Sequence, residues 1–266
     1  MSINYDALML GSNVKLTDKV TIYVPTIGEL VKVEDDGFSL YQRVFVVSVR
    51  ELFSGMPEEV DKIEENYPTI WEMAFDKDMG EQVGSGMFKE GSSLLEILLG
   101  GLSYWTRIPT EEFKILVQSK KIVSEKYDWV IDRKAYDAFS EYIKFLTLYK
   151  VNEDLIAPKG ISSKPNQCKV WSALYKGRIY KLRKQPASTL GDKILVLETE
   201  ANSFIPFEEI RKMTYYQFIN LYSSYEVKEA NDREFALFTS SKFDTKDMKL
   251  KDWRDSVSLI KRKTTL

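Results

Sequence analysis

A nine-residue apolar run, Leu94–Leu102, constrains the fold of this chain more than any other segment. It would cross about half of a lipid bilayer, and it carries Glu96 near its middle, which excludes a membrane span. We expect a buried helix here, with Ser92 or Ser93 as its N-cap. Because the chain has one cysteine, Cys168, no internal disulfide can form, and stability must come from helix packing.

The chain contains no histidine among its 266 residues. This excludes Ser-His-Asp triads, Cys-His pairs and histidine-ligated metals. The single thiol also excludes a zinc site built from several cysteines. Carboxylate pairs could be drawn from many of the 40 acidic residues, so no pair is specific. We therefore expect a protein without catalytic residues, without a metal and without a cofactor.

Two segments come close to ligand-binding motifs and fail at the decisive residue. Gly86–Ser93 has the spacing of a phosphate-binding loop, but Ser92 stands where the motif requires lysine. Asp76–Gly80 resembles the start of a calcium loop, but Met87 stands at the twelfth position, where a bidentate glutamate is required. We interpret the glycines from Gly80 to Gly91 as marking a loop.

The first half of the chain alternates between strand and helix patterns. Val14–Val24 predicts a strand or short hairpin, and Thr26 lies three residues before Glu29, the spacing of a capping box. Apolar residues on helical spacing predict a helix over Phe38–Phe53. Also expected are a helix from Pro57, a meander of Phe113–Gln118, Lys121–Val123 and Trp129–Ile131, and a helix capped by Asp132 with a core stripe of Tyr136, Phe139, Ile143 and Leu146.

The segment Asn152–Pro165 is rich in proline, glycine and serine and is the best linker candidate in the chain. We place the domain boundary there, with a mixed α/β domain at 1–155 and a helical domain at 156–266. The fold class is α+β, predominantly α. The helices expected after the linker are one through Cys168, Trp171 and Leu182, one from Leu190 to Phe204, one over Phe207–Tyr225, and the pieces Asp232–Phe238 and Met248–Ile260.

The charges are unevenly placed although the net charge is -2. Nine acidic residues against two lysines lie between Pro57 and Glu81, and seven bases with no acid lie between Lys164 and Lys184. Two solvated faces would explain this pattern, and so would complementary docking within the chain or between copies. The candidate cationic contact residues are Lys176, Arg178, Lys181 and Arg183.

Aromatic side chains cluster around Tyr215, Tyr216 and Tyr222 and cover more than one face of the expected helix. Tyrosine combines a large apolar body with a polar tip and is enriched where proteins meet. A core with a partly covered rim is one reading of this cluster. A partner-binding surface is the other, and these three tyrosines are its candidate residues.

Two parts of the chain resemble proteins encoded among the tail morphogenesis genes of tailed phages of Gram-positive bacteria. The first part is Val20–Leu30, with its strand, proline, threonine, glycine and acid. The second part is longer and consists of Val170-Trp171 followed by Lys176–Arg178, a helix from Leu190, the segment Ile210–Phe218, and a helix containing Trp253.

The resemblance implies a non-enzymatic role in tail or baseplate assembly, as a chaperone-like protein or as a built-in component, with no catalytic residue to carry over. The expected partners are other phage tail proteins, with self-association as a further option and no membrane. The expected location is the host cytoplasm during assembly, and incorporation into the virion is left open. A nucleic-acid-binding protein made during infection is the alternative function.

Overall fold

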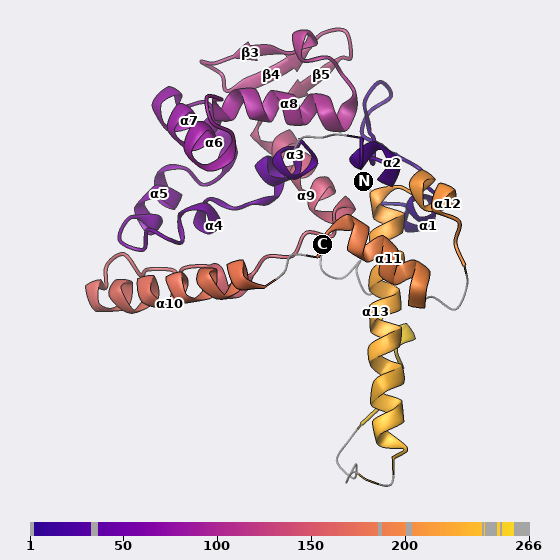
Figure 1. Cartoon of the computed structure of the whole chain (residues 1–266). Helices are drawn as coiled ribbons and strands as arrows, with labels where there is room; N and C mark the ends of the chain where they lie inside the picture. The colour runs from indigo at the N-terminus through magenta and orange to yellow at the C-terminus, as the bar shows by residue number, and fades with distance from the viewer. Residues whose placement is uncertain are drawn as a thin grey trace. The chain divides into compact units, whose positions relative to one another are not determined.

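The computed structural model consists mainly of α-helices, with two small antiparallel sheets (Figure 1). The expected α+β, predominantly α class is confirmed. By internal contacts the chain forms two units: unit 1 comprises Met1–Asn13, Pro25–Val31 and Ser188–Leu266, and unit 2 comprises Val14–Val24 and Lys32–Ala187. The structure describes residues 3–32, 37–185, 188–200, 204–240, 242, 249–250 and 252–257.

The apolar run forms helix α8 (Leu94–Thr106), which packs against α3 (Gly37–Val46) in unit 2. Ser93 begins α8 with a capping box, so the predicted buried helix and its cap are confirmed. At Gly101 the two helices come so close that a Cβ atom would lie 2.7 Å from the buried ring of Phe45. Glycine is therefore required at this contact.

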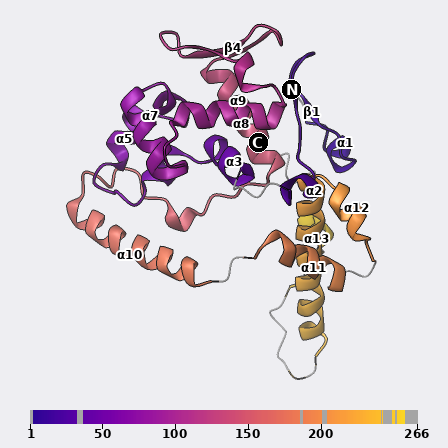
Figure 2. The same cartoon turned by 45° about the horizontal axis from the view of Figure 1, so that its top comes forward.

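The predicted meander and the helix after it are also present in unit 2. Strands β3 (Lys114–Leu116), β4 (Lys121–Ser124) and β5 (Trp129–Ile131) pair in the antiparallel order β3-β4-β5. Asp132 caps α9 (Arg133–Leu146), and the predicted stripe on α9 is buried. The sheet lies at one end of unit 2, opposite the end where α10 lies, as both views show (Figures 1 and 2).

The helix expected over Phe38–Phe53 is divided in two. Helix α3 ends at Val46, and α4 (Val49–Phe53) begins at a capping box in which Ser48 pairs with Glu51. The Ser48 hydroxyl accepts a bond from the Glu51 N–H, so this residue starts a new helix instead of continuing the previous one. The apolar spacing alone carried no sign of this interruption.

The expected loop at Gly80–Gly91 is wrong over most of its length. Its residues form the end of α7 (Lys77–Val83) and a π-helical turn, η1 (Gly84–Phe88). A Cβ atom at Gly84 would lie 2.4 Å from the backbone nitrogen of Leu94. This glycine permits close packing of backbone on backbone, which explains its presence without a loop.

The remaining elements of unit 2 are short. Of the two structures expected for Val14–Val24, a strand or a short hairpin, the hairpin is present, with its two strands paired antiparallel. The bounds are β1 (Val14–Lys15), β2 (Thr21–Ile22), α5 (Val60–Asn66), α6 (Ile70–Ala74), η2 (Thr110–Glu112), η3 (Glu153–Leu155) and α10 (Pro165–Lys184).

The division by contacts places α10 in unit 2, whereas the domains 1–155 and 156–266 divide the chain before this helix. As separately folding parts, those two domains stay a prediction. The segment Asn152–Pro165 is not a bare linker, because Ala157 and Ile161 are buried in unit 2. Its prolines and glycine shape a turn that packs against the rest of the unit.

Unit 1 consists of helices from both ends of the sequence. The helix expected over Phe207–Tyr225 is interrupted at Thr214, where a second capping box begins a longer helix that reaches Phe238. The expected helix at Met248–Ile260 is described only in part. The bounds are α1 (Tyr5–Met9), α2 (Ile27–Leu30), α11 (Leu190–Glu200), α12 (Phe207–Lys212), α13 (Tyr215–Phe238) and α14 (Arg254–Val257).

Candidate interaction surfaces

Pieces of the two regions that carry the phage resemblance pair with each other in unit 1, Pro25–Ile27 from the first and Met213–Tyr215 from the second, whereas Val20–Val24 and Val170–Arg178 belong to unit 2. Thr26 and Thr214 form an isolated antiparallel bridge. The Ile27 N–H donates to the Met213 carbonyl at 2.8 Å, and the Tyr215 N–H donates to the Pro25 carbonyl at 2.8 Å. Residues from opposite ends of the chain therefore form one hydrogen-bonded element.

Both threonines of this bridge also begin helices. Thr26 forms a capping box with Glu29 at the start of α2, as predicted, and Thr214 forms one with Gln217 at the start of α13. At Gly28, a Cβ atom would lie 2.6 Å from the side chain of Arg211. The glycine of the first segment is thus needed for the close approach of the second.

An apolar cluster lies beneath this pair. Its buried members are Ile27, Leu197, Ile210 and Phe218. Tyr215 packs against the cluster and is partly buried, and burial raises the pKa of its phenol.

The tyrosines expected to face a partner differ in exposure. Tyr216 is fully buried, so its side chain does not lie on the surface of unit 1. Tyr222 is partly exposed, stacks on Phe218 and has the Lys193 ammonium 5.7 Å from its ring. The core reading therefore fits Tyr216 in this structure, and partner binding by Tyr215 and Tyr222 stays a prediction.

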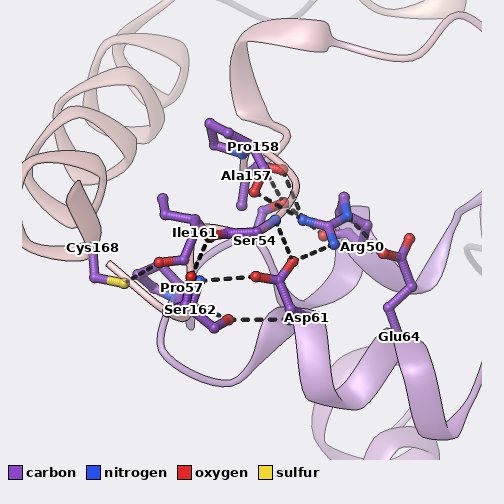
Figure 3. Close-up of polar contacts among 12 residues, drawn as sticks. Arg50, Ser54, Pro57, Asp61, Glu64, Ala157, Pro158, Ile161, Ser162 and Cys168 are labelled. Carbon is purple, nitrogen blue, oxygen red and sulfur yellow. Dashed lines mark hydrogen bonds and ion pairs between the residues drawn. The ribbon is translucent and has the colours of Figure 1, made fainter. Parts of the chain in front are cut away.

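In unit 2, the Arg50 side chain joins α4 to α5 and to the turn that precedes α10 (Figure 3). Its guanidinium is 7% exposed and lies 2.6 Å from the Asp61 carboxylate and 2.5 Å from the Glu64 carboxylate. It also donates to the carbonyls of Ala157 and Pro158, each at 3.1 Å. Every part of this buried cation thus has a partner, as burial of a charge requires.

Asp61 fixes the same turn from the other side. Its carboxylate accepts bonds from the N–H groups of Gly160 at 3.1 Å and Ser162 at 2.8 Å. Burial raises the pKa of Asp61, but the hydrogen bonds from Arg50, Ser162 and Gly160 outweigh it and lower the pKa to about 2. The acid is ionised at neutral pH and holds the turn before α10.

No local pattern in the sequence indicates this Arg50 cluster. The carbonyl partners of Arg50 lie 107 and 108 positions along the chain. Asp61 and Glu64 belong to the acid-rich stretch Pro57–Glu81, for which solvated faces were one reading. Two acids of that stretch are therefore partners of the buried Arg50 guanidinium and are not explained by a solvated face alone.

Helix α10 is anchored to unit 2 by one face. Cys168 and Trp171 are buried, and the Trp171 indole N–H donates to the Ser54 carbonyl at 2.7 Å. Tyr175, one turn further on, packs against Gly55, where a Cβ atom would lie 3.1 Å from its ring. These contacts confirm that one side of the predicted basic helix belongs to the core.

The four cations expected to form one face of α10 are divided. Lys176, Lys181 and Arg183 are exposed, and the part of the chain that the structure describes offers them no carboxylate partner. Arg178 is different, because it donates to the Asp154 carbonyl and lies 5.6 Å from the ring of Trp171. At about 100° per residue, Arg178 lies nearly opposite Lys176 on the helix. Arg178 fixes η3 to α10, so its guanidinium is less available for binding a partner than the three exposed cations.

Three further findings concern ligands and membranes. Within the described residues, no group of three or more acidic or cysteine side chains is placed to hold a metal ion. The described helices include none that is long and apolar enough to span a bilayer. Beside Glu72, Arg133 and Asp137 lies a hollow of about 510 Å³, where Arg133 pairs with both carboxylates.

A model of the family described as "YomV second domain" matches residues 181–258. This family name is phage-derived. The matched range contains Ile210–Phe218, the later of the two paired segments, but not Ile27, which completes the apolar cluster of unit 1 in this chain. No curated protein and no solved structure matches the chain.

Proposed function

We propose that this protein works by binding other phage proteins during the assembly of a tail or baseplate, in the host cytoplasm. The observation that carries the proposal is the pairing of Pro25–Ile27 with Met213–Tyr215. Each of the two regions that resemble tail morphogenesis proteins contributes one strand-like piece to this pairing, which supports reading these pieces as parts of one motif. The phage-derived family match over 181–258 supports the same direction.

Helix α10 supports binding as the mode of action. It presents exposed cations, of which Lys176, Lys181 and Arg183 have no carboxylate partner among the described residues, beside exposed apolar side chains that include Val170 and Leu174. A solvated helix face needs no such apolar residues, and charged surfaces select and steer partners of opposite sign. Catalysis is not part of the proposal, since no residue constellation in the sequence supports a reaction.

The test is co-purification of the tagged full-length protein from cells that express the tail genes of its phage. Mass spectrometry should identify tail proteins with the wild-type chain and markedly fewer with the variant Lys176→Glu, Lys181→Glu, Arg183→Glu. Arg178 is kept because it contacts Asp154. Equal recovery of tail proteins with both chains would show that these cations do not bind the partner. Recovery of no tail protein with either chain would contradict the proposed function.

The matched control is Lys19→Glu, Lys89→Glu, Lys121→Glu, which changes the net charge equally at exposed lysines elsewhere. It should leave recovery unchanged. A salt titration separates the nucleic-acid alternative, because phosphate binding gives a steep linear loss of log affinity with log salt. A protein interface with apolar anchors and a few ion pairs loses affinity less steeply with salt, and this is the behaviour we expect.

A further inference from the structure

Helix α10 has a second apolar stripe on the side away from the core of unit 2. Val170 is 61% exposed and Leu174 49% exposed, one turn apart. Ala173 and Gly177 are exposed beside them, so the stripe continues at helical spacing. A helix that is covered on one side has no need of a second stripe for its own unit.

The stripe runs into a hollow of about 340 Å³ at the start of the helix. Val170, Trp171 and Leu174 line it from α10 together with Asn166 and Gln167, and Pro158 and Ile161 line it from the preceding turn. Although two amide side chains belong to the lining, the surface that it exposes is almost entirely apolar. Arg50 holds that turn by donating to the Pro158 carbonyl at 3.1 Å.

Gly177 extends the stripe and gives an independent sign that something approaches it. A Cβ atom at this position would meet nothing within 4 Å, so none of the described residues packs closely against this glycine. An exposed glycine in a helix interior costs about 1 kcal/mol relative to alanine. Close approach of another backbone is a common reason to keep glycine in such a place.

The charges around the stripe indicate which charge its binding partner carries. Lys169 and Lys176 flank one side, and Lys181 follows Gly177 one turn later. Between Lys164 and Lys184 the chain has seven bases and no acid. Two copies of α10 packed against each other would bring like charges together, which disfavours self-pairing through this stripe.

We infer that the outer stripe of α10 is the docking site for an acidic amphipathic helix of a partner protein. Apolar residues of that helix fill the hollow at Val170 and Leu174, its backbone passes over Gly177, and its carboxylates face Lys169, Lys176 and Lys181. The helix-in-groove mode uses such a combination of apolar anchors and flanking charge. This inference rests on the proposed function and specifies the partner's chemistry.

The test uses the purified full-length protein and a fluorescein-labelled acidic peptide of about 18 residues, or five helical turns, with leucines at i, i+3, i+4 and i+7 and glutamates on the flanks. Two further peptides are compared with it, one with lysine in place of glutamate and one with the same composition but no stripe. Fluorescence anisotropy should show saturable binding of the acidic amphipathic peptide and at least about tenfold weaker binding of both others. Equal affinity for the acidic and lysine peptides would overturn the inference.

Leu174→Asp should weaken binding of the acidic peptide at least about tenfold, because it puts a like charge in the hollow. Leu195→Asp is the matched control, since Leu195 is 60% exposed on α11, outside the stripe. Circular dichroism should show unchanged folding of both variants. If Leu174→Asp binds as tightly as the wild type, the stripe is not the site.

The other occupants are outcomes of the same experiment. A dimer in light scattering that Leu174→Asp dissociates would assign the stripe to a second copy and contradict the inference. Binding of a single-stranded oligonucleotide in competition with the peptide would assign it to nucleic acid. If tail proteins still co-purify with Leu174→Asp, the proposed function is supported but the stripe is not the docking site. If the acidic peptide binds but no tail protein co-purifies with the wild type, the docking site is supported and the proposed role in tail assembly is contradicted.

Discussion

Helices α8 and α10 of unit 2 both contain glycines and apolar residues on more than one side, but only α8 is covered. At Gly101 of α8, added bulk would collide with Phe45 at 2.7 Å. At Gly177 of α10, it would meet nothing within 4 Å. Glycine therefore lies at a close helix–helix contact in α8 but faces open space in α10.

The difference shows how a helix surface can indicate a missing neighbour. The residues of α8 that face inward, including Leu98 and Trp105, are fully buried, so its composition is explained within the unit. Helix α10 buries Trp171 on one side and leaves Val170 and Leu174 in solvent on the other. Nothing in the described part of unit 2 covers this second side, which is the basis of the docking inference.

The largest effect is expected from Gly101→Ala in α8. The new methyl group overlaps the ring of Phe45, which is 2% exposed and has no room to move. We expect a loss of about 1–3 kcal/mol in the free energy of unfolding, the usual cost of overpacking a core. Urea denaturation followed by circular dichroism measures it, and an unchanged midpoint would show that the contact between α3 and α8 is looser than described.

A smaller effect concerns Asp61, which holds the turn before α10. Its pKa is about 2 in the folded protein and near 3.8 when unperturbed, so its ionisation stabilises the fold above the higher value. This stabilisation declines as the pH falls from about 5 toward 2, with a loss of about 1 kcal/mol by pH 3. The stability gap between the wild type and Asp61→Asn should therefore be smaller at pH 3 than at pH 7, and a constant gap in urea titrations would contradict this.

The smallest effect, of opposite sign to that at Gly101, is expected from Gly177→Ala. Alanine has the higher helix propensity and meets no neighbour here, so the free protein should become more stable by about 0.5–1 kcal/mol. Thermal unfolding of the two alanine variants side by side gives the comparison directly. Destabilisation by Gly177→Ala would mean that this face of α10 is already covered.

Much of the fold could be predicted because its signals are local. Ser93, Thr26 and Asp132 begin helices by bonds to backbone groups three residues away, a spacing visible in the sequence. The apolar spacing of α9 likewise identifies its buried side. The interruptions at Ser48 and Thr214 were missed although they use the same chemistry, because continuous apolar spacing outweighed them in the prediction.

The surfaces could be predicted only in part. The basic character of α10 is visible in the sequence. The sequence does not show that Arg178 differs from the other cations, because this difference comes from its hydrogen bond to Asp154, which precedes the helix. The aromatic cluster indicates Tyr216 and Tyr222 equally, yet only Tyr216 is completely buried in the structure. Contacts between residues far apart in sequence decide both cases, and no local pattern contains them.

Because unit 1 pairs residues from both ends of the sequence, it can fold only after the C-terminal part of the chain has been synthesised. The Gln217 amide donates to the Met9 carbonyl, 208 positions earlier, and Ile27 shares a core with Phe218. At about 5–20 residues per second, the ribosome needs roughly 10–40 s to deliver the later residues after the earlier ones emerge. Unit 2, whose described elements end with α10 at Lys184, can fold while the nascent chain still awaits its closing helices.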